Sequence, residues 1–418
     1  MYSPQSAIRN PQSALGRLGA LLLALLTLSC DPPKNDSSQK QVPKAATTKS
    51  SPAKGKVQHV FPGDDLQAAL NRAADNQIHK SVLVHAGTYR PKTPGHSLVY
   101  LNARHEGVRL MAVGEVILTA ANPDIAHQSD ASYPAIVHHV VYFGDGISRK
   151  TVLRGFKITG AKHFVSGDQD ATLMEPCTQC PEKDAYFYLD GGGIKIFGKS
   201  YPTILDVHVH DNYASPCAGG VSVQHPKPAG GVRYSNPATE NSVLFRNCIF
   251  ENNHSRVTGS ALDLLWGSSA VLENCLFVGN ISNTGTDFTV DPGTRTQYDS
   301  EHGCGALTVL PGSGVRVIRC TFTGNFNGTD DMGTGSTYTD SIFWSNTARG
   351  GISPGSRYEL AIEDGKGVKG CFLHGEIDDL RGTVDARRNT LAAPNPRFDA
   401  SYRPQAREYA NVGYRPKN

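Results

Sequence analysis

Four short strands, each preceded by a Gly-rich turn, carry side chains that could perform chemistry. Their first and third residues are apolar, so strand alternation places the second residue on the outer surface. This alignment puts Lys195, Ser222, Asp263 and Thr308 in one outward column. Lys195 and Asp263 are then two repeats apart, about 10 Å. A solvent-exposed lysine could act as a base or bind a carboxylate, and the aspartate could bind hydroxyls or a cation. Together the two side chains would suit the binding of a sugar unit. Unrelated surface residues are the alternative interpretation.

Further side chains flank this column. Phe197 and Gln224 fall in the next outward column, and His225 and Trp266 follow at the strand ends. Aromatic rings stack on sugar rings, and polar groups bond to hydroxyls. The predicted catalytic residues are Lys195, Asp263 and His225, and the predicted substrate-binding residues are Ser222, Gln224, Trp266 and Phe197.

A second outward patch is expected on neighbouring strands. It combines Lys157, His208, His210 and Glu251. The two histidines share one strand face, so they could ligate a metal together or transfer protons. Ordinary surface histidines are the alternative.

These strands belong to a repeating pattern. The motif F-x-x-N recurs from Phe250, Phe277, Phe322 and Phe343, and Val209 to Asn212 is a weaker copy. Alternation points the Phe inward, where successive copies stack, and each Asn is expected at a turn in left-handed backbone geometry, bonded to the Asn above and below. Gly-rich turns such as Gly191-Gly192-Gly193-Ile194 form a second repeated motif. Successive F-x-x-N copies from Phe250 to Phe343 begin 27, 45 and 21 residues apart. Repeats spaced in this way indicate the coils of a solenoid.

Both motifs, and PGDDLQAALNRAA followed by VLVHAGTYRP, resemble bacterial right-handed parallel β-helix proteins of the pectate-lyase-like superfamily. The F-x-x-N and G-G-A-I repeats resemble those of chlamydial polymorphic outer-membrane proteins. The resemblance covers roughly residues 58–375 and implies an all-β, right-handed parallel β-helix (solenoid). It also implies that the amphipathic helix over residues 65–74 caps the first coil.

Catalytic signatures of related enzymes are incomplete. Asp330-Asp331 resembles the paired aspartates of polygalacturonases, but the neighbouring signatures of that family are absent. The acids of loop 281–303 could bind Ca²⁺, which uronate lyases often use, although loop acids commonly serve solubility. These acids are Asp287, Asp291, Asp299 and Glu301.

Seven of the nine cysteines fall into three groups. Cys248, Cys275, Cys320 and Cys371 occupy one inward column, whose parallel Cβ bonds disfavour bridging, so buried free thiols are expected. Cys177 and Cys180 lie in a polar stretch and are expected to form a local disulfide rather than a metal site. Cys30 belongs to the N-terminal signal.

The N-terminal segment predicts export. Residues 18–28 form an apolar run too short to span a bilayer, and Cys30 follows it as in the lipobox of bacterial lipoproteins, although Thr27 replaces the preferred Leu. An ordinary signal peptide is the alternative. Residues 1–30 are thus expected to be a signal peptide with Cys30 lipidated, 31–57 a disordered tether, 58–375 the β-helix and 376–418 a cap over its C-terminal end.

Composition limits the remaining choices. Only 19% of the residues are charged, with 41 basic and 38 acidic side chains, too even a balance for a protein dedicated to nucleic acid. We expect a monomeric, exported, membrane-anchored protein of the periplasm or cell surface. Its expected partner is an extracellular polysaccharide, degraded by lyase or glycosidase chemistry; the alternative is a non-catalytic surface protein for adhesion or glycan binding.

Overall fold

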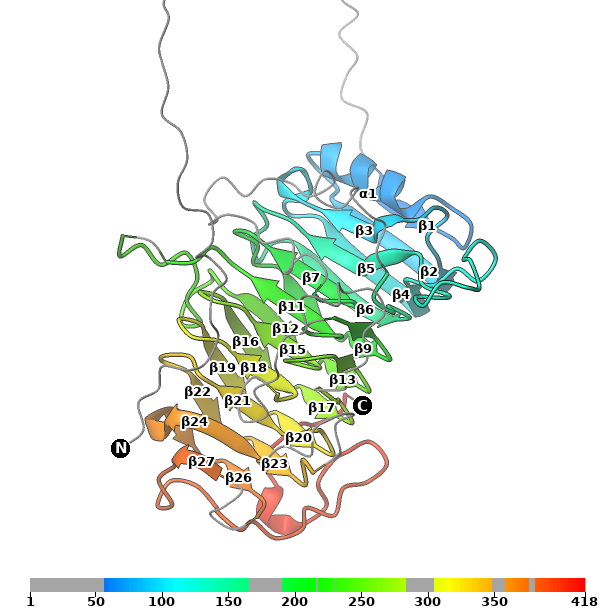
Figure 1. Ribbon diagram of the computed structural model, residues 1–418. Coiled ribbons are helices and arrows are strands. Elements are labelled where there is room, and N and C mark those ends of the chain that lie inside the picture. Colours follow the sequence, from blue (N-terminus) through cyan, green and yellow to red (C-terminus); the bar gives the residue numbers. More distant parts are fainter. Residues whose placement is uncertain are drawn as a thin grey trace, which may run out of the picture. The chain divides into compact units, whose positions relative to one another are not determined.

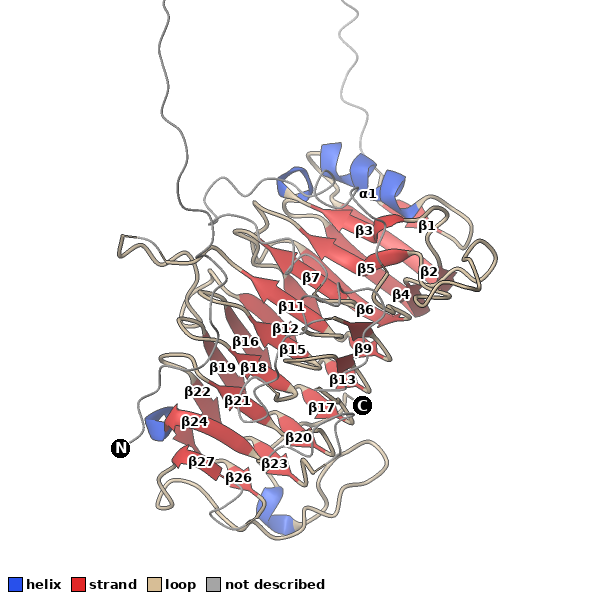
Figure 2. Ribbon diagram, in the orientation of Figure 1, coloured by secondary structure: helices blue, strands red, loops and turns tan. Residues whose placement is uncertain are grey.

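The structure is a computed structural model that describes residues 56–164, 190–215, 217–228, 230–282, 304–347, 358–375 and 380–417. Residues Gly55–Asn418 form one compact unit. The fold is an all-β parallel β-helix with a single α-helix among the described residues, which confirms the predicted fold class. Figures 1 and 2 show its strands stacked coil upon coil. The described residues contain no helix that is long and apolar enough to cross a membrane.

One face of the solenoid is a sheet of nine parallel strands, which includes the four strands that follow the Gly-rich turns. We call it the Gly-turn sheet. Its strands are β3 (Gly95–Leu101), β5 (Val137–Phe143), β7 (Ile194–Phe197), β11 (Val221–Gln224), β15 (Leu262–Leu264), β18 (Leu307–Val309), β21 (Thr329–Asp331), β24 (Leu360–Asp364) and β27 (Leu380–Thr383).

The other two faces are branches of a second, 16-stranded sheet. The first half of β6 pairs with β8 and its second half with β9, so the sheet divides at this point. The undivided part holds β1 (Gln58–Val60), β2 (Ser81–Tyr89), β4 (Arg109–Thr119) and β6 (Val152–Thr159). One branch holds β8 (Thr203–Leu205), β12 (Val243–Arg246), β16 (Ser269–Glu273), β19 (Gly314–Ile318), β22 (Thr337–Thr339) and β25 (Val368–Lys369). The F-x-x-N branch holds β9 (His208–His210), β13 (Ile249–Glu251), β17 (Leu276–Val278), β20 (Thr321–Thr323), β23 (Ile342–Trp344) and β26 (Phe372–Leu373).

Shorter elements complete the coils. Strands β10 (Tyr213–Ala214) and β14 (His254–Ser255) pair at the turn that leads from the F-x-x-N branch back to the Gly-turn sheet. The 3₁₀ helices are η1 (Ala103–His105), η3 (Gly365–Gly367) and η5 (Arg407–Tyr409).

Helix α1 (Leu66–Asp75) packs against the first strands β1, β2 and β3 (Figure 1). Asp65 begins the helix, because its carboxylate accepts a hydrogen bond from the Ala68 amide at 2.9 Å. Leu66, Ala69 and Leu70 are buried on the face that meets the solenoid. The predicted capping helix is confirmed.

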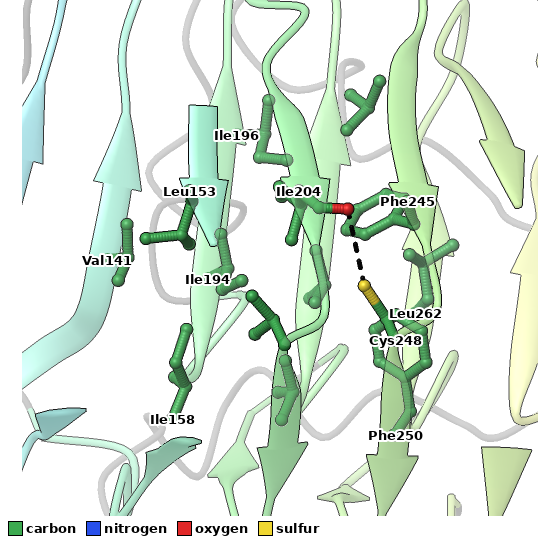
Figure 3. Close-up of a cluster of buried hydrophobic side chains, with 14 of the residues drawn as sticks. Val141, Leu153, Ile158, Ile194, Ile196, Ile204, Phe245, Cys248, Phe250 and Leu262 are labelled. Carbon is green, nitrogen blue, oxygen red and sulfur yellow. Dashed lines mark hydrogen bonds between the residues drawn. The ribbon is translucent and has the colours of Figure 1, made fainter. Parts of the chain in front are cut away.

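The interior repeats from coil to coil, as the sequence predicts. The rings of Phe250, Phe277, Phe322 and Phe343 stack with centroids 4.6, 4.3 and 4.9 Å apart. Cys248, Cys275, Cys320 and Cys371 are buried free thiols. Figure 3 shows Cys248 among Phe245, Phe250 and Leu262, with its thiol donating to the Ile204 carbonyl at 3.5 Å.

The asparagines form the predicted ladder, but their backbone geometry differs from the prediction. Asn212, Asn253, Asn280, Asn325 and Asn346 are buried, and each of the first four donates from Nδ2 to Oδ1 of the next, over 2.7–3.1 Å. The left-handed backbone belongs to the residue before each asparagine, which is Asp211, Asn252, Gly279, Gly324 or Ser345. The ladder side chains can therefore point inward while their neighbours make the turn.

The C-terminal segment differs from a simple end cap. Residues 388–390 continue the last coil, since the Thr390 amide donates to the Cys371 carbonyl at 2.9 Å. Residues 391–417, which we call the strap, then run back over the outer surface of the F-x-x-N branch. Tyr409 packs on Phe372, and the Tyr414 amide donates to Thr321 Oγ1 at 2.9 Å. The strap thus covers a side of the solenoid.

Several predicted features lie outside the described residues. They are the signal peptide with Cys30, the tether as far as residue 55, the pair Cys177 and Cys180, and the acids Asp287, Asp291, Asp299 and Glu301.

Candidate functional site

The predicted outward column on the Gly-turn sheet has the register that the sequence indicates. Ser222 pairs with Lys195 on one side and with Asp263 on the other. The column extends to Tyr142 before Lys195 and to Thr308 after Asp263. Lys195 and Asp263 therefore lie two strands apart on one face of the sheet.

The predicted solvent exposure of this column is wrong. Lys195, Ser222 and Asp263 are each 0% exposed. Strand alternation distinguishes the inside of a coil from its outside, but it does not reveal whether the outside is covered. These residues therefore form a buried polar cluster rather than an open surface for a polymer.

Burial sets the electrostatics of this cluster. It lowers the pKa of Lys195, an effect that the carboxylates of Asp190 and Asp263 oppose. It raises the pKa of Asp263 to about 7, with the Lys195 ammonium and the Ser222 hydroxyl opposing the shift. Lys195 Nζ donates to Ser222 Oγ at 3.2 Å.

Asp190 and Cys217 complete the cluster, and the sequence reading did not identify either. The Cys217 amide donates to Asp190 Oδ1 at 3.0 Å. Potential ligand atoms of Asp190, Cys217 and Asp263 all lie within 4.8 Å of one another. A signal was present in the sequence: each of the two missed residues stands four positions before the first residue of its strand, Ile194 or Val221.

Three histidines lie beside Lys195 on the preceding strands, and they were also missed. His96 and His139 contact the Tyr142 ring, and His138 lies next to both of these histidines. The rings of His96 and His139 are 5.1 Å apart. His139 Nδ1 bonds to the Gly191 carbonyl at 2.8 Å, and burial lowers its pKa well below the usual value. These side chains enlarge the buried polar cluster.

His225 has a structural position rather than the predicted catalytic one. It is buried, its Nε2 donates to the Ser200 carbonyl at 2.8 Å, and its Nδ1 accepts from the Ser269 amide at 3.3 Å. Burial lowers its pKa to about 3. Both ring nitrogens are thus engaged by backbone groups.

The other predicted substrate-binding residues do not gather around Lys195 as an open surface. Phe197 is buried, whereas Gln224 and Trp266 are half-buried. The Lys227 ammonium lies 5.0 Å from the centroid of the Trp266 ring. This lysine–tryptophan contact joins two neighbouring turns.

The second predicted patch does come together at the surface. His208 pairs with Lys157 on one side, and His210 pairs with Glu251 on the other. His208 Nε2 lies 2.8 Å from Glu251 Oε2, and these side chains are 27% and 36% exposed. Burial and the neighbouring His210 lower the pKa of His208, and Glu251 opposes that shift. Lys157 forms an ion pair with Glu115 at 2.6 Å. We call Lys157, His208, His210 and Glu251 the histidine patch.

A solvent-facing pocket of about 340 Å³ continues this patch. Asp211 and Asn252, which line it, directly follow His210 and Glu251 in the chain. Tyr213 and His254 pair across β10 and β14, and Lys162 bridges to Tyr213. We call the pocket formed by Lys162, Asp211, Tyr213, Asn252 and His254 the turn pocket.

The adjacent aspartates Asp330 and Asp331 are both buried and bonded to tyrosines. The Tyr358 hydroxyl donates to Asp330 at 3.2 Å, and the Tyr338 hydroxyl donates to Asp331 at 2.7 Å. Burial also raises the pKa of Asp331. The burial and these hydrogen bonds give both aspartates a structural role in the packed interior.

Comparisons with protein-family models, with curated proteins and with solved structures return no match to this chain.

Proposed function

We propose that this chain is a carbohydrate-binding β-helix protein and that it holds a polysaccharide along the histidine patch and the turn pocket. The observation that carries the proposal is the continuity of these two solvent-facing sites. Asp211 and Asn252 of the pocket directly follow His210 and Glu251 of the patch. A polymer could contact both sites without entering the protein.

The chemistry of this face suits sugars. Tyr213 and His254 offer rings that can pack on a sugar ring, and Lys162 and Asp211 offer charged groups for carboxylates or hydroxyls. Successive strands set such groups about 4.8 Å apart, close to the length of one sugar unit. The resemblance of the repeats to pectate-lyase-like proteins supports the same substrate class.

The buried cluster at Lys195 and Asp263 fits this function less well than the sequence suggested. With no exposed surface, these side chains offer a polymer nothing to contact. Glycan binding is therefore assigned to the histidine patch and the turn pocket.

The test is a binding screen of the full-length chain against uronate-containing and neutral polysaccharides. Tyr213→Ala should weaken binding of the best ligand by about twofold to tenfold, as expected for loss of one aromatic stacking contact. Tyr234→Ala is the matched control, because Tyr234 is half-buried elsewhere and contacts Lys199. Binding that is equal in both variants, or absent for every polysaccharide, would refute the proposal.

Polysaccharide cleavage is a second candidate, favoured by the hydrogen-bonded pair of His208 and Glu251. A histidine oriented by a carboxylate can act as a general base. Release of unsaturated products would indicate a lyase, and release of reducing ends alone would indicate a hydrolase. Cleavage that is lost in His208→Ala while binding persists would support catalysis. Binding without either product in the parent protein would leave only the binding function.

We also propose that the protein is exported and anchored through a lipid on Cys30. The apolar run at 18–28 followed by Cys30 supports this location. Cys30→Ser should abolish incorporation of labelled fatty acid and release the protein from the membrane fraction. Labelling that persists in this variant would overturn the proposal.

A further inference from the structure

We propose that Asp190, Cys217 and Asp263 form a buried site for one divalent transition-metal ion, with Zn²⁺ as the best fit. Asp190 precedes β7, Cys217 precedes β11 and Asp263 lies in β15, so the three ligands come from adjacent coils of the Gly-turn sheet. A metal ion here would tie those coils together. This site is separate from the proposed glycan-binding face.

The first observation is the geometry of the donor atoms. One carboxylate oxygen of each aspartate and the Cys217 sulfur all lie within 4.8 Å of one another. An ion centred between them would be within about 3 Å of each, and small side-chain rotations would bring them to the zinc distances of about 2.0–2.3 Å. All three residues are buried.

The second, independent observation is the state of the Asp263 carboxylate. The residue is 0% exposed, and among the described residues neither of its oxygens receives a hydrogen bond of normal geometry. Buried carboxylates are normally hydrogen-bonded, paired or metal-bound. Asp263 therefore has unused ligand capacity next to two further donors.

Charge balance supports the same conclusion. With the Cys217 thiol neutral and Asp263 ionised, two carboxylates face the single ammonium of Lys195, which leaves one net negative charge in a dry environment. A divalent ion that converts Cys217 to a thiolate brings the sum of Asp190, Asp263, Cys217, Lys195 and the ion to zero. Binding would release the thiol proton to solvent.

The donor set also selects the metal. Ca²⁺ and Mg²⁺ require oxygen ligands, whereas a thiolate favours Zn²⁺ or another borderline-soft ion. Cobalt(II) is a suitable probe for the proposed site, because its thiolate complexes absorb light and Zn²⁺ displaces it.

The experiment uses the purified full-length chain, stripped with a chelator and then titrated with Co²⁺ and Zn²⁺. We expect one equivalent of Co²⁺, a thiolate-to-cobalt absorption band, and loss of that band on adding Zn²⁺. Cys217→Ser should abolish the band, and Asp263→Asn should weaken metal binding by more than about tenfold. Zn²⁺ should raise the melting temperature of the parent protein but not that of Cys217→Ser.

Cys320→Ser is the matched control. Cys320 is a fully buried thiol of the inward column, where serine already occurs naturally at Ser341. A serine at position 320 could also accept the Cys275 amide, as the Ser341 hydroxyl does for Cys320. This variant should keep the full absorption band and the Zn²⁺-dependent rise in melting temperature.

Two results would overturn the proposal. One is a parent protein that gives no thiolate-to-cobalt band and no Zn²⁺-dependent rise in melting temperature. The other is a band that survives in Cys217→Ser, which would place the metal on other cysteines. If Cys217→Ser does not fold, Asp263→Asn and the displacement of cobalt from the parent protein still decide the question. Neither readout depends on glycan binding.

Discussion

The side-chain amide of Asn346 donates to the carboxylate of Glu359, which also accepts the Asn346 backbone amide at 3.1 Å. Every side-chain amide in the asparagine ladder donates toward the C-terminal end of the solenoid. The last member therefore needs an acceptor for its side-chain amide and for its backbone amide. A buried carboxylate meets this requirement, because both of its oxygens are acceptors.

Replacing the end of the ladder should destabilise the solenoid. Glu359→Gln keeps one acceptor but turns an NH₂ group toward a donor of Asn346, so we expect a loss of about 2 kcal/mol in the free energy of unfolding. Glu363→Gln is the control: it lies in β24, which begins directly after Glu359, but is exposed, and should cost less than about 0.5 kcal/mol. Equal denaturation midpoints for the two variants would show that the ladder does not depend on its carboxylate.

The buried lysine should matter for stability as well as for any chemistry. In chelator-treated protein, Lys195→Met should lower the free energy of unfolding by about 3–5 kcal/mol, because Asp190 and Asp263 would lose the charge of a buried neighbouring ammonium. Lys157→Met breaks a partly exposed ion pair and should cost at most about 1 kcal/mol. Denaturant unfolding of both variants is the measurement. An unchanged Lys195→Met protein would contradict the burial of this side chain.

Mild acid should destabilise the fold through buried neutral histidines. Burial lowers the pKa of His225 to about 3 and that of His105 to about 4. In the unfolded chain both take up a proton below about pH 6.5, whereas in the folded chain they stay neutral to lower pH. Their stabilising contribution is therefore present above pH 6.5 and is lost as the pH falls toward 4.

This effect can be isolated with His225→Gln, in which the glutamine amide can still donate to Ser200. Between pH 7 and pH 5 the parent protein should lose about 2 kcal/mol more than this variant. The exposed His79→Gln is the control and should lose stability with pH as the parent does. Urea unfolding at the two pH values gives the comparison, and parallel losses in parent and His225→Gln would refute the assignment.

The strap should be an integral part of the fold. Tyr414 is buried against Leu276 and Val278 on the outer surface of the F-x-x-N branch. Tyr414→Ala should cost about 3 kcal/mol, as other large buried side chains do. Lys417→Ala, which removes a partly exposed ion pair with Asp206, should cost less than about 1 kcal/mol. A Tyr414→Ala protein that melts like the parent would make the strap dispensable.

The repeat core could be predicted from the sequence because the same residue types return in each coil. The stacked Phe250 and Phe277, and the pairing of Lys195, Ser222 and Asp263, follow from aligning repeated motifs with strand alternation. Such an alignment gives register and direction. The alignment does not show whether other parts of the chain cover the outer surface. For this reason the burial of Lys195 was not predicted.

The histidine cluster was missed for a different reason. His138 and His139 lie in β5, in a stretch that lacks the F-x-x-N and Gly-turn motifs. Strand β5 joins the sheet through pairing of Tyr142 with Lys195, and no residue type in the sequence marks that pairing. The path of the strap could likewise not be predicted from the sequence, because Tyr414 contacts coils formed far earlier in the chain.

The strap changes how the solenoid can come apart. Repeats in a solenoid usually touch only their neighbours, so such arrays can unfold piecewise from either end. Here Lys417 reaches Asp206, 211 residues away, and the Arg415 amide donates to Asn274. Opening a middle coil therefore requires release of the chain terminus. The strap thus holds several coils together along the solenoid, so that they are expected to unfold as a single cooperative unit.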